Sequence, residues 1–218
     1  MHPVKPLADC RLYAFVDSAY LHDRTPADLT RQLCDGGADL IQLRAKDWPE
    51  EKIRQTAETL LPITRAAGIP LVINDHWQLA IEHGAYGVHL GQGDLVTADL
   101  SAIARAGLRL GISTHGYAEL CRAIQIRPSY IALGHIFPTR TKDMPSAPQG
   151  PARLADYVSL CKYHSIPTVA IGGIKLSNID TVAATGTDAI AVVTAITESD
   201  NPEDAVNALR GRCRRADH

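Results

Sequence analysis

The chain has 218 residues, of which 45% are hydrophobic, and this is enough for one globular domain with a sizeable core. Its formal net charge of −2 excludes a general attraction to nucleic acid or to acidic membranes, so an anionic ligand must be held by a local cluster of charge. The five cysteines form no C-x-x-C pair, and no apolar run is long enough to span a bilayer or to act as a signal peptide, so we expect reduced thiols in a cytoplasmic protein.

Short apolar runs rich in β-branched residues alternate with segments of helical periodicity along the chain. The runs predict strands at 12–16, 40–43, 70–73, 87–90, 108–112, 130–133, 168–171 and 189–193. The segments between them predict helices at 26–35, 50–67, 76–83, 97–106, 116–126, 152–164, 177–185 and 202–213. Eight strand–helix units predict an α/β protein with a single (β/α)8 TIM barrel over residues 1–218. A doubly wound open sheet is the alternative, but no G-x-G-x-x-G turn follows the first strand.

The second strand carries polar residues on one face. Period-two alternation places Gln42, Arg44 and Lys46 on the opposite side from the apolar residues between them. The apolar side is expected to meet the helices, so the polar side points into the mouth of the barrel. Two cations and an amide on one strand face suit a phosphate. Structural ion pairs with Asp39 or Asp47 are the alternative.

Carboxylates follow the next two strands, where the active sites of such barrels lie. Asn74 and Asp75 end the third strand, and Asp94 follows the fourth. Two carboxylates at adjacent strand ends can share Mg²⁺, which binds a few carboxylates together with phosphate oxygens. Taken alone, either aspartate fits a helix cap better than a metal ligand, but the two together, opposite Arg44 and Lys46, favour magnesium-bound pyrophosphate. Ser113 after the fifth strand favours the cap when this stretch is taken by itself.

A second cluster of hydrogen-bond donors follows the later strands. The stretch "GHIFPTRTK" at 134–142 presents Thr139, Thr141 and Lys142 directly after an apolar strand. Gly173 and Thr194 come after the seventh and eighth strands, where these barrels commonly bind phosphate. These residues predict a second anion site, and Lys142 could reach either one. Two phosphorylated groups facing each other suggest a reaction that joins them.

The sequence shows no evident covalent nucleophile. No cysteine or serine stands in an evident triad with a histidine and a carboxylate, and no Cys/His spacing indicates zinc. His89 lies within an apolar strand and is predicted to be a packed, hydrogen-bonded residue. His135 follows a glycine at a strand end, where a general acid or base could sit.

Taken together, these segments resemble the thiamine phosphate synthase family, in its enterobacterial type. The matching segments occur in order along nearly the whole chain: "IQLRAK", "VINDHWQLA", "YGVHLGQGDL", "GISTH", "IALGHIFPTRTKDMPSAPQG", "VAIGGI" and "IAVVTAI". The resemblance implies a (β/α)8 barrel that condenses 4-amino-2-methyl-5-hydroxymethylpyrimidine diphosphate with 4-methyl-5-(2-phosphoethyl)-thiazole. The products are thiamine phosphate and pyrophosphate. The implied reaction is dissociative and passes through a pyrimidine cation.

The resemblance also implies roles for individual residues. The residues expected to hold the pyrimidine diphosphate, called here the diphosphate set, are Gln42, Arg44, Lys46, Asn74, Ser113 and Lys142. Four of these, Arg44, Lys46, Ser113 and Lys142, are expected to be catalytic. The residues expected to hold the thiazole phosphate, called here the thiazole set, are Thr139, Thr141, Gly173, Val193 and Thr194. Asp75 and Asp94 are expected to bind Mg²⁺.

Two positions depart from the family pattern. Gly93 stands where an acidic residue is common, and Thr194 stands where serine is common. The related thiazole tautomerases are the nearest alternative, because they use a histidine at the position of His135. They tend to lack the metal aspartates that this chain has. A non-catalytic phosphate sensor is a further alternative. The expected partners are the two small-molecule substrates, with no nucleic acid and no membrane, and a homo-oligomer is left open.

Overall fold

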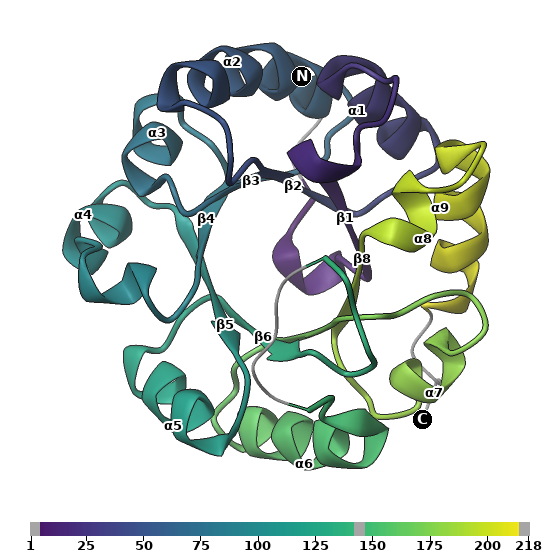
Figure 1. Ribbon diagram of the computed structural model, residues 1–218. Helices are drawn as coiled ribbons and strands as arrows, with labels where there is room; N and C mark the ends of the chain where they lie inside the picture. The colour runs from purple at the N-terminus through teal and green to yellow at the C-terminus, as the bar shows by residue number, and fades with distance from the viewer. Residues whose placement is uncertain (1–4, 142–146, 214–218) are drawn as a thin grey trace.

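The computed structural model describes residues 5–141 and 147–213, and within them eight parallel strands form a closed barrel. Each strand pairs with the next along the chain, and the last pairs back to the first (Figure 1). The strands are β1 (Leu12–Asp17), β2 (Leu40–Arg44), β3 (Leu71–Asn74), β4 (Gly87–Leu90), β5 (Arg109–Thr114), β6 (Tyr130–Gly134), β7 (Thr168–Ile171) and β8 (Ala189–Val192). The predicted TIM barrel is confirmed, and the open-sheet alternative is wrong.

The helices form a ring outside the strands (Figure 1). They are α1 (Pro26–Asp35), α2 (Glu50–Ala66), α3 (Trp77–Glu82), α4 (Leu100–Arg105), α5 (Tyr117–Ile126), α6 (Gly150–Tyr163), α7 (Ile179–Ala183), α8 (Thr194–Thr197) and α9 (Pro202–Arg212). In the part of the chain that the structure describes, three short 3-10 helices accompany them: η1 (Leu7–Asp9), η2 (Ser18–Tyr20) and η3 (Asp94–Val96). The sequence predicts all of the α-helices except α8, whose four residues are too few to show a helical period. In the described residues, no helix is both long and apolar enough to cross a bilayer.

The first and last of the longer helices begin with the same local pattern. Thr25 accepts a hydrogen bond from the Asp28 amide at the start of α1, and Asn201 accepts one from the Asp204 amide at the start of α9. In both cases a proline occupies the first helical turn and an acidic residue follows. The cap side chains accept hydrogen bonds from backbone amides that have no partner within the helix. The proline has no amide hydrogen that needs a partner, and the carboxylate is stabilised by the positive end of the helix dipole. These signals fix the residues at which α1 and α9 begin.

Two apolar cores lie on either side of the strands. The outer core packs alternate strand residues such as Ile41 and Leu43 against the helices. The inner core holds the other strand residues, with Tyr13, Phe15 and Tyr130 facing small side chains on β6 to β8. The alternation expected for β2 is therefore confirmed. Because large aromatic residues fill one part of the barrel and small residues line the other, a cavity remains above the inner core.

Candidate active site

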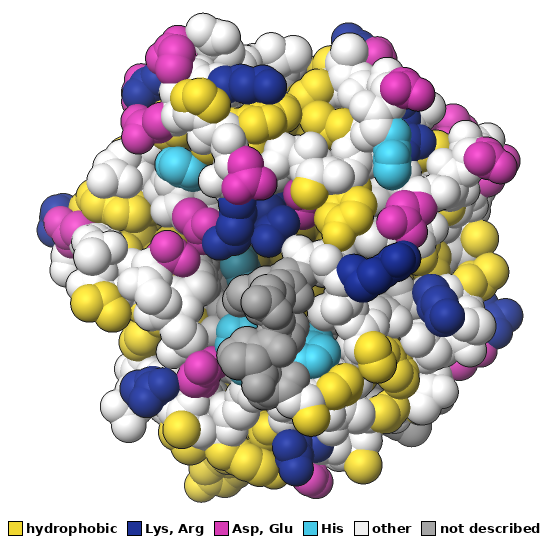
Figure 2. All heavy atoms as spheres, in the orientation of Figure 1, with side chains coloured by type: hydrophobic (Ala, Val, Ile, Leu, Met, Phe, Trp, Pro, Cys, Tyr) yellow, Lys and Arg dark blue, Asp and Glu magenta, His cyan; other side chains and the backbone are white. Residues whose placement is uncertain are grey.

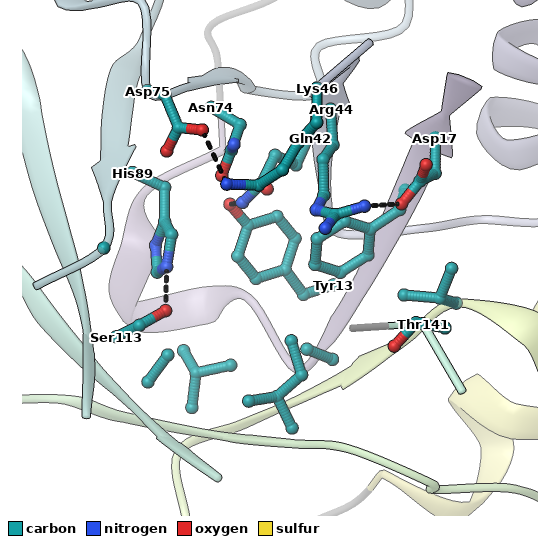
Figure 3. Close-up of a pocket in the computed structure, with 17 residues that line it drawn as sticks. Tyr13, Asp17, Gln42, Arg44, Lys46, Asn74, Asp75, His89, Ser113 and Thr141 are labelled. Atoms are coloured by element: carbon teal, nitrogen blue, oxygen red, sulfur yellow. Dashed lines mark hydrogen bonds and ion pairs between the residues drawn. The ribbon is translucent and has the colours of Figure 1, made fainter. Parts of the chain in front are cut away.

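A cavity opens at the carboxyl ends of the strands, in the mouth of the barrel. Lysine, arginine and acidic side chains gather there, next to the centre of the view in Figure 2. The lining residues come from around the whole barrel: Tyr13, Phe15, Asp17, Gln42, Arg44, Lys46, Asn74, Asp75, His89, Gly91, Ser113, Ala132, Thr141, Val169, Ile171, Ala191 and Val193. Every described member of the diphosphate set lines this cavity (Figure 3). Lys142, the remaining member, lies outside the described residues.

The cationic wall of the cavity depends on a carboxylate that sequence reasoning missed. Arg44 Nη1 donates to Asp17 Oδ2 at 2.5 Å, and the Asp17 side chain is only 1% exposed. Asp39, one of the two partners named for the ion-pair alternative, instead lies at the opposite end of β2, where it pairs with Lys5. The signal was present in the strand register, since Asp17 and Arg44 are paired residues on neighbouring strands. This register places a fixed guanidinium beside the cavity.

Of the two aspartates of the predicted metal site, Asp75 lines the cavity, and Asp94 neighbours Asp75 without lining it. Asp75 Oδ2 lies 3.1 Å from Lys46 Nζ (Figure 3). Burial raises the pKa of Asp75, Lys46 opposes this shift, and the neighbouring Asp94 adds to it. Asp94 Oδ2 accepts a hydrogen bond from the Gly91 amide at 3.1 Å. The reading of Asp75 as a helix cap is wrong, because His76 occupies the cap position of α3.

The donors in this region fit a divalent cation that also binds the substrate. Two neighbouring carboxylates repel each other, and a cation between them stabilises the ionised form of both. Among the described residues, no group of three or more His, Cys, Asp or Glu side chains gathers as a metal cluster. The protein would therefore supply two carboxylates, and phosphate oxygens and water would supply the rest. This is the usual arrangement for Mg²⁺, which seldom has a cage made of protein alone.

Ser113 lies on the far wall of the cavity from the cations. It belongs to β5, and its hydroxyl is 2.8 Å from His89 Nε2. The preference for a helix cap at Ser113 is wrong, because Gly116 precedes α5 and the serine side chain points to His89 (Figure 3). His89 is buried and hydrogen-bonded, as predicted, and it also reaches the cavity.

The thiazole set is divided between this cavity and a second one beside it. Thr141 and Val193 line the main cavity. Thr139, Gly173 and Thr194 line the second cavity. The hydroxyls of Thr139 and Thr141 are 2.9 Å apart and so connect the two. The second cavity also contains two cations that sequence reasoning missed, Arg140 and Lys175.

The glycines after β7 have a role in packing that the sequence did not predict. Gly172 and Gly173 both have positive φ, where side chains are strained. A Cβ atom at Gly173 would lie 2.4 Å from the Pro138 carbonyl oxygen, and one at Gly172 would lie 2.4 Å from the His135 Cβ atom. The absence of side chains therefore lets the segment after β6 lie directly against the end of β7.

His135 is the first residue of this segment and does not line the main cavity. It is 6% exposed, and its Nδ1 has no hydrogen-bond partner among the described residues. Burial lowers the pKa of His135, and the nearby His115 lowers it further. A lowered pKa keeps this imidazole neutral at neutral pH.

The two departures from the family pattern are accommodated without strain. Gly93 has ordinary helical dihedral angles, and a Cβ atom there would meet no atom within 4 Å. A side chain at this position would fit, so the fold does not require the glycine. Thr194 begins α8 and lines the second cavity with Gly173.

The chain is similar in sequence and in structure to enzymes that form thiamine phosphate. The family profile described as thiamine monophosphate synthase matches residues 12–196. A thiamine-phosphate synthase from Serratia proteamaculans is 51% identical over 189 residues, which cover 86% of this chain and 84% of that protein. One from Neisseria meningitidis serogroup A is 50% identical over 184 residues, which cover 84% of this chain and 89% of that protein. The solved thiamine phosphate pyrophosphorylase from Pyrococcus furiosus has a TM-score of 0.84 at 27% identity and covers 95% of this chain and 98% of that one.

Proposed function

The chain belongs to the thiamine monophosphate synthase family, and on that premise we propose how its barrel mouth forms thiamine phosphate. The enzyme is a transferase. It joins 4-amino-2-methyl-5-hydroxymethylpyrimidine diphosphate to 4-methyl-5-(2-phosphoethyl)-thiazole and releases pyrophosphate. The observation that carries the proposal is the meeting of Arg44 and Lys46 with Asp75 and the neighbouring Asp94 at one side of the cavity.

The diphosphate is bound at this charged side. Arg44, held by Asp17, presents donors in a fixed direction, and Lys46 adds a second cation. Asp75 and Asp94 would hold Mg²⁺, which when bound supplies positive charge to the oxygens of the leaving pyrophosphate. Gln42 and Asn74 lie beside these groups and offer amides to the same ligand. Lys142 remains a prediction from the sequence.

The reaction needs no nucleophile from the protein. The bond between the exocyclic carbon of the pyrimidine and the diphosphate oxygen breaks, and both electrons leave with pyrophosphate. The amino group of the ring stabilises the resulting cation, and the thiazole nitrogen then donates its lone pair to that carbon. No cysteine is among the described residues that line the cavity, and burial raises the pKa of the Cys10 thiol to about 12. The contribution of the protein is to stabilise charge on the leaving group and to exclude water.

The thiazole phosphate is bound at the side of the second cavity. Thr139, Gly173 and Thr194 surround that cavity together with the cations Arg140 and Lys175. Thr141 and Val193 face the main cavity, where the thiazole ring must lie to reach the pyrimidine. Binding the phosphate in one cavity and the ring in the other orients the attacking nitrogen and contributes through proximity.

The tautomerase and sensor alternatives are not favoured. Relatives of the tautomerase type use a histidine at the position of His135, and His135 does not line the main cavity here. A non-catalytic phosphate sensor does not require a pair of metal-binding carboxylates beside its diphosphate site.

The test is an incubation of the purified protein with Mg²⁺ and both substrates, with thiamine phosphate and pyrophosphate measured together. We expect the two products in equal amounts. Pyrophosphate release without thiamine phosphate, or no reaction at all, contradicts the proposal. Isomerisation of a thiazole phosphate as the only activity would establish the tautomerase instead.

A further inference from the structure

A continuous chain of hydrogen bonds runs beneath the main cavity from β2 to β5. Gln42 Nε2 donates to the Tyr13 hydroxyl at 2.7 Å, and that hydroxyl is 3.0 Å from the Tyr130 hydroxyl. The Tyr130 hydroxyl is 3.0 Å from His89 Nδ1, and His89 Nε2 is 2.8 Å from the Ser113 hydroxyl. We call these five residues the buried relay. Its two ends, Gln42 and Ser113, both line the cavity.

The middle of the buried relay is almost fully buried, although Tyr13 and His89 also line the cavity. Tyr13 and Tyr130 are each 1% exposed, and the His89 and Tyr130 rings stack with centroids 5.6 Å apart. Gly111 makes room for this contact, because a Cβ atom there would lie 2.1 Å from Tyr130 Cζ and 2.6 Å from His89 Nδ1. Tyr130 does not line the cavity, so a bound ligand has no direct contact with it.

The number of protons on each group determines which partner donates in each hydrogen bond of the buried relay. A phenol has one proton, so each buried tyrosine hydroxyl can donate only once. The Gln42 amide nitrogen can only donate, and it donates to Tyr13. For the buried hydroxyls to be satisfied, Tyr13 then donates to Tyr130, and Tyr130 donates to His89 Nδ1. A neutral imidazole that accepts at Nδ1 carries its proton on Nε2, and that proton is donated to Ser113.

We propose that the buried relay sets Ser113 as a hydrogen-bond donor to the substrate and leaves the Gln42 carbonyl oxygen as an acceptor. Tyr130 is a positioning residue, because it acts through His89 and Ser113, and His89, which also lines the cavity, orients the Ser113 hydroxyl. This proposal rests on the proposed function for the identity of the ligand, an aminopyrimidine. Such a ring has an amino group that donates hydrogen bonds and ring nitrogens that accept them. It therefore matches a site in which the Gln42 carbonyl oxygen accepts and the Ser113 hydroxyl donates. Exchanging the donor and acceptor roles at either Gln42 or Ser113 requires every hydrogen bond of the buried relay to change direction.

The direction of the buried relay can be tested without any substrate. Nitrogen-15 NMR of the histidine rings in the wild-type protein distinguishes a protonated ring nitrogen from an unprotonated one, and His89→Gln assigns the signal by its loss. We expect His89 as the neutral tautomer with its proton on Nε2, and we expect Tyr130→Phe to give a mixture of tautomers. A proton on Nδ1 in the wild type overturns the proposal. This measurement stands even if the protein forms no thiamine phosphate.

Kinetics test whether the buried relay acts through Ser113. Tyr130→Phe removes one hydroxyl and should lower kcat/KM for the pyrimidine diphosphate by about three- to tenfold, the size of one neutral hydrogen bond, with KM for the thiazole phosphate unchanged. In a Ser113→Ala background the same change should have no further effect. Additive losses in the double variant, or no loss in the single variant, would refute the proposal.

Tyr86→Phe is the matched control. The Tyr86 hydroxyl accepts a hydrogen bond from the Leu7 amide at 3.1 Å, away from the cavity. Its removal should leave both kinetic constants within about twofold of the wild type, because Tyr86 has no bond to the buried relay. A loss equal to that of Tyr130→Phe overturns the assignment. If Tyr130→Phe does not fold, the tautomer of the wild type decides the question alone.

Discussion

The substitution Asp17→Asn tests whether the negative charge of Asp17 holds Arg44 beside the cavity. The asparagine keeps the shape of the side chain and can still accept the hydrogen bond from the Ala19 amide, 3.0 Å away. It loses the charge that faces Arg44 Nη1 at 2.5 Å. The guanidinium then lies beside the cavity without its counter-charge.

The expected loss of stability follows from how deeply the pair is buried. Removing one partner of a fully buried ion pair costs about 3–5 kcal/mol. Arg44 is 17% exposed and reaches water in the cavity, so part of its charge stays solvated after the substitution. We therefore expect a decrease of about 1.5–3 kcal/mol in the free energy of unfolding, the size of a lost hydrogen bond to a charged group. For a chain of this length, that corresponds to a fall in Tm of about 3–12 °C.

The assay is thermal unfolding with and without Mg²⁺ and inorganic pyrophosphate. Pyrophosphate oxygens can take the place of the lost carboxylate, so the ligand should raise the Tm of Asp17→Asn more than that of the wild type. Asp180→Asn is the control, because it removes the carboxylate of an ion pair whose side chains are both more than half exposed, and its Tm should stay close to that of the wild type. If Asp17→Asn keeps the Tm and the pyrophosphate response of the wild type, Asp17 does not hold Arg44.

Two further substitutions test the other side of the site. Thr141→Val removes a hydroxyl at the junction of the two cavities and should raise the KM for the thiazole phosphate by about ten- to a hundredfold, with little change in the KM for the pyrimidine diphosphate. Steady-state kinetics with each substrate varied in turn measure this, and equal effects on both substrates contradict the division between the cavities. His135→Asn should lower thiamine phosphate formation by less than about 10²-fold, because His135 lies outside the main cavity. A loss of about a thousandfold in a folded variant that still binds both substrates would identify His135 as a general acid or base.

The strands and most of the helices could be predicted from the sequence because burial on both sides leaves a strong pattern. Each strand packs on the helices and on the barrel interior, so it appears as a short apolar run bounded by polar residues. The Gln42-x-Arg44-x-Lys46 alternation also predicted which side chains face the cavity. The short helix α8 was missed because four residues carry no periodicity.

The contacts between strands could not be predicted, since they depend on register. Asp17 follows an apolar run, so its sequence position indicates the start of a loop. The ion pair becomes evident only from the strand register, in which Asp17 lies opposite Arg44. Tyr130 reads as one more apolar strand residue, although its hydroxyl lies in the buried relay. Ser113 and Asp75 were ambiguous for a different reason. A polar residue shortly before a helix fits a cap as well as a site, and only the direction of its side chain separates the two.

The most direct test of the magnesium–diphosphate site is the rate of thiamine phosphate formation from both substrates, measured with Mg²⁺ and again in excess chelator. Asp94→Ala is measured in parallel, because Asp94 neighbours Asp75 and begins the short 3-10 helix η3 after β4. We predict that chelation abolishes turnover and that Asp94→Ala sharply lowers it while the protein remains folded. Wild-type turnover that survives in excess chelator would contradict the account.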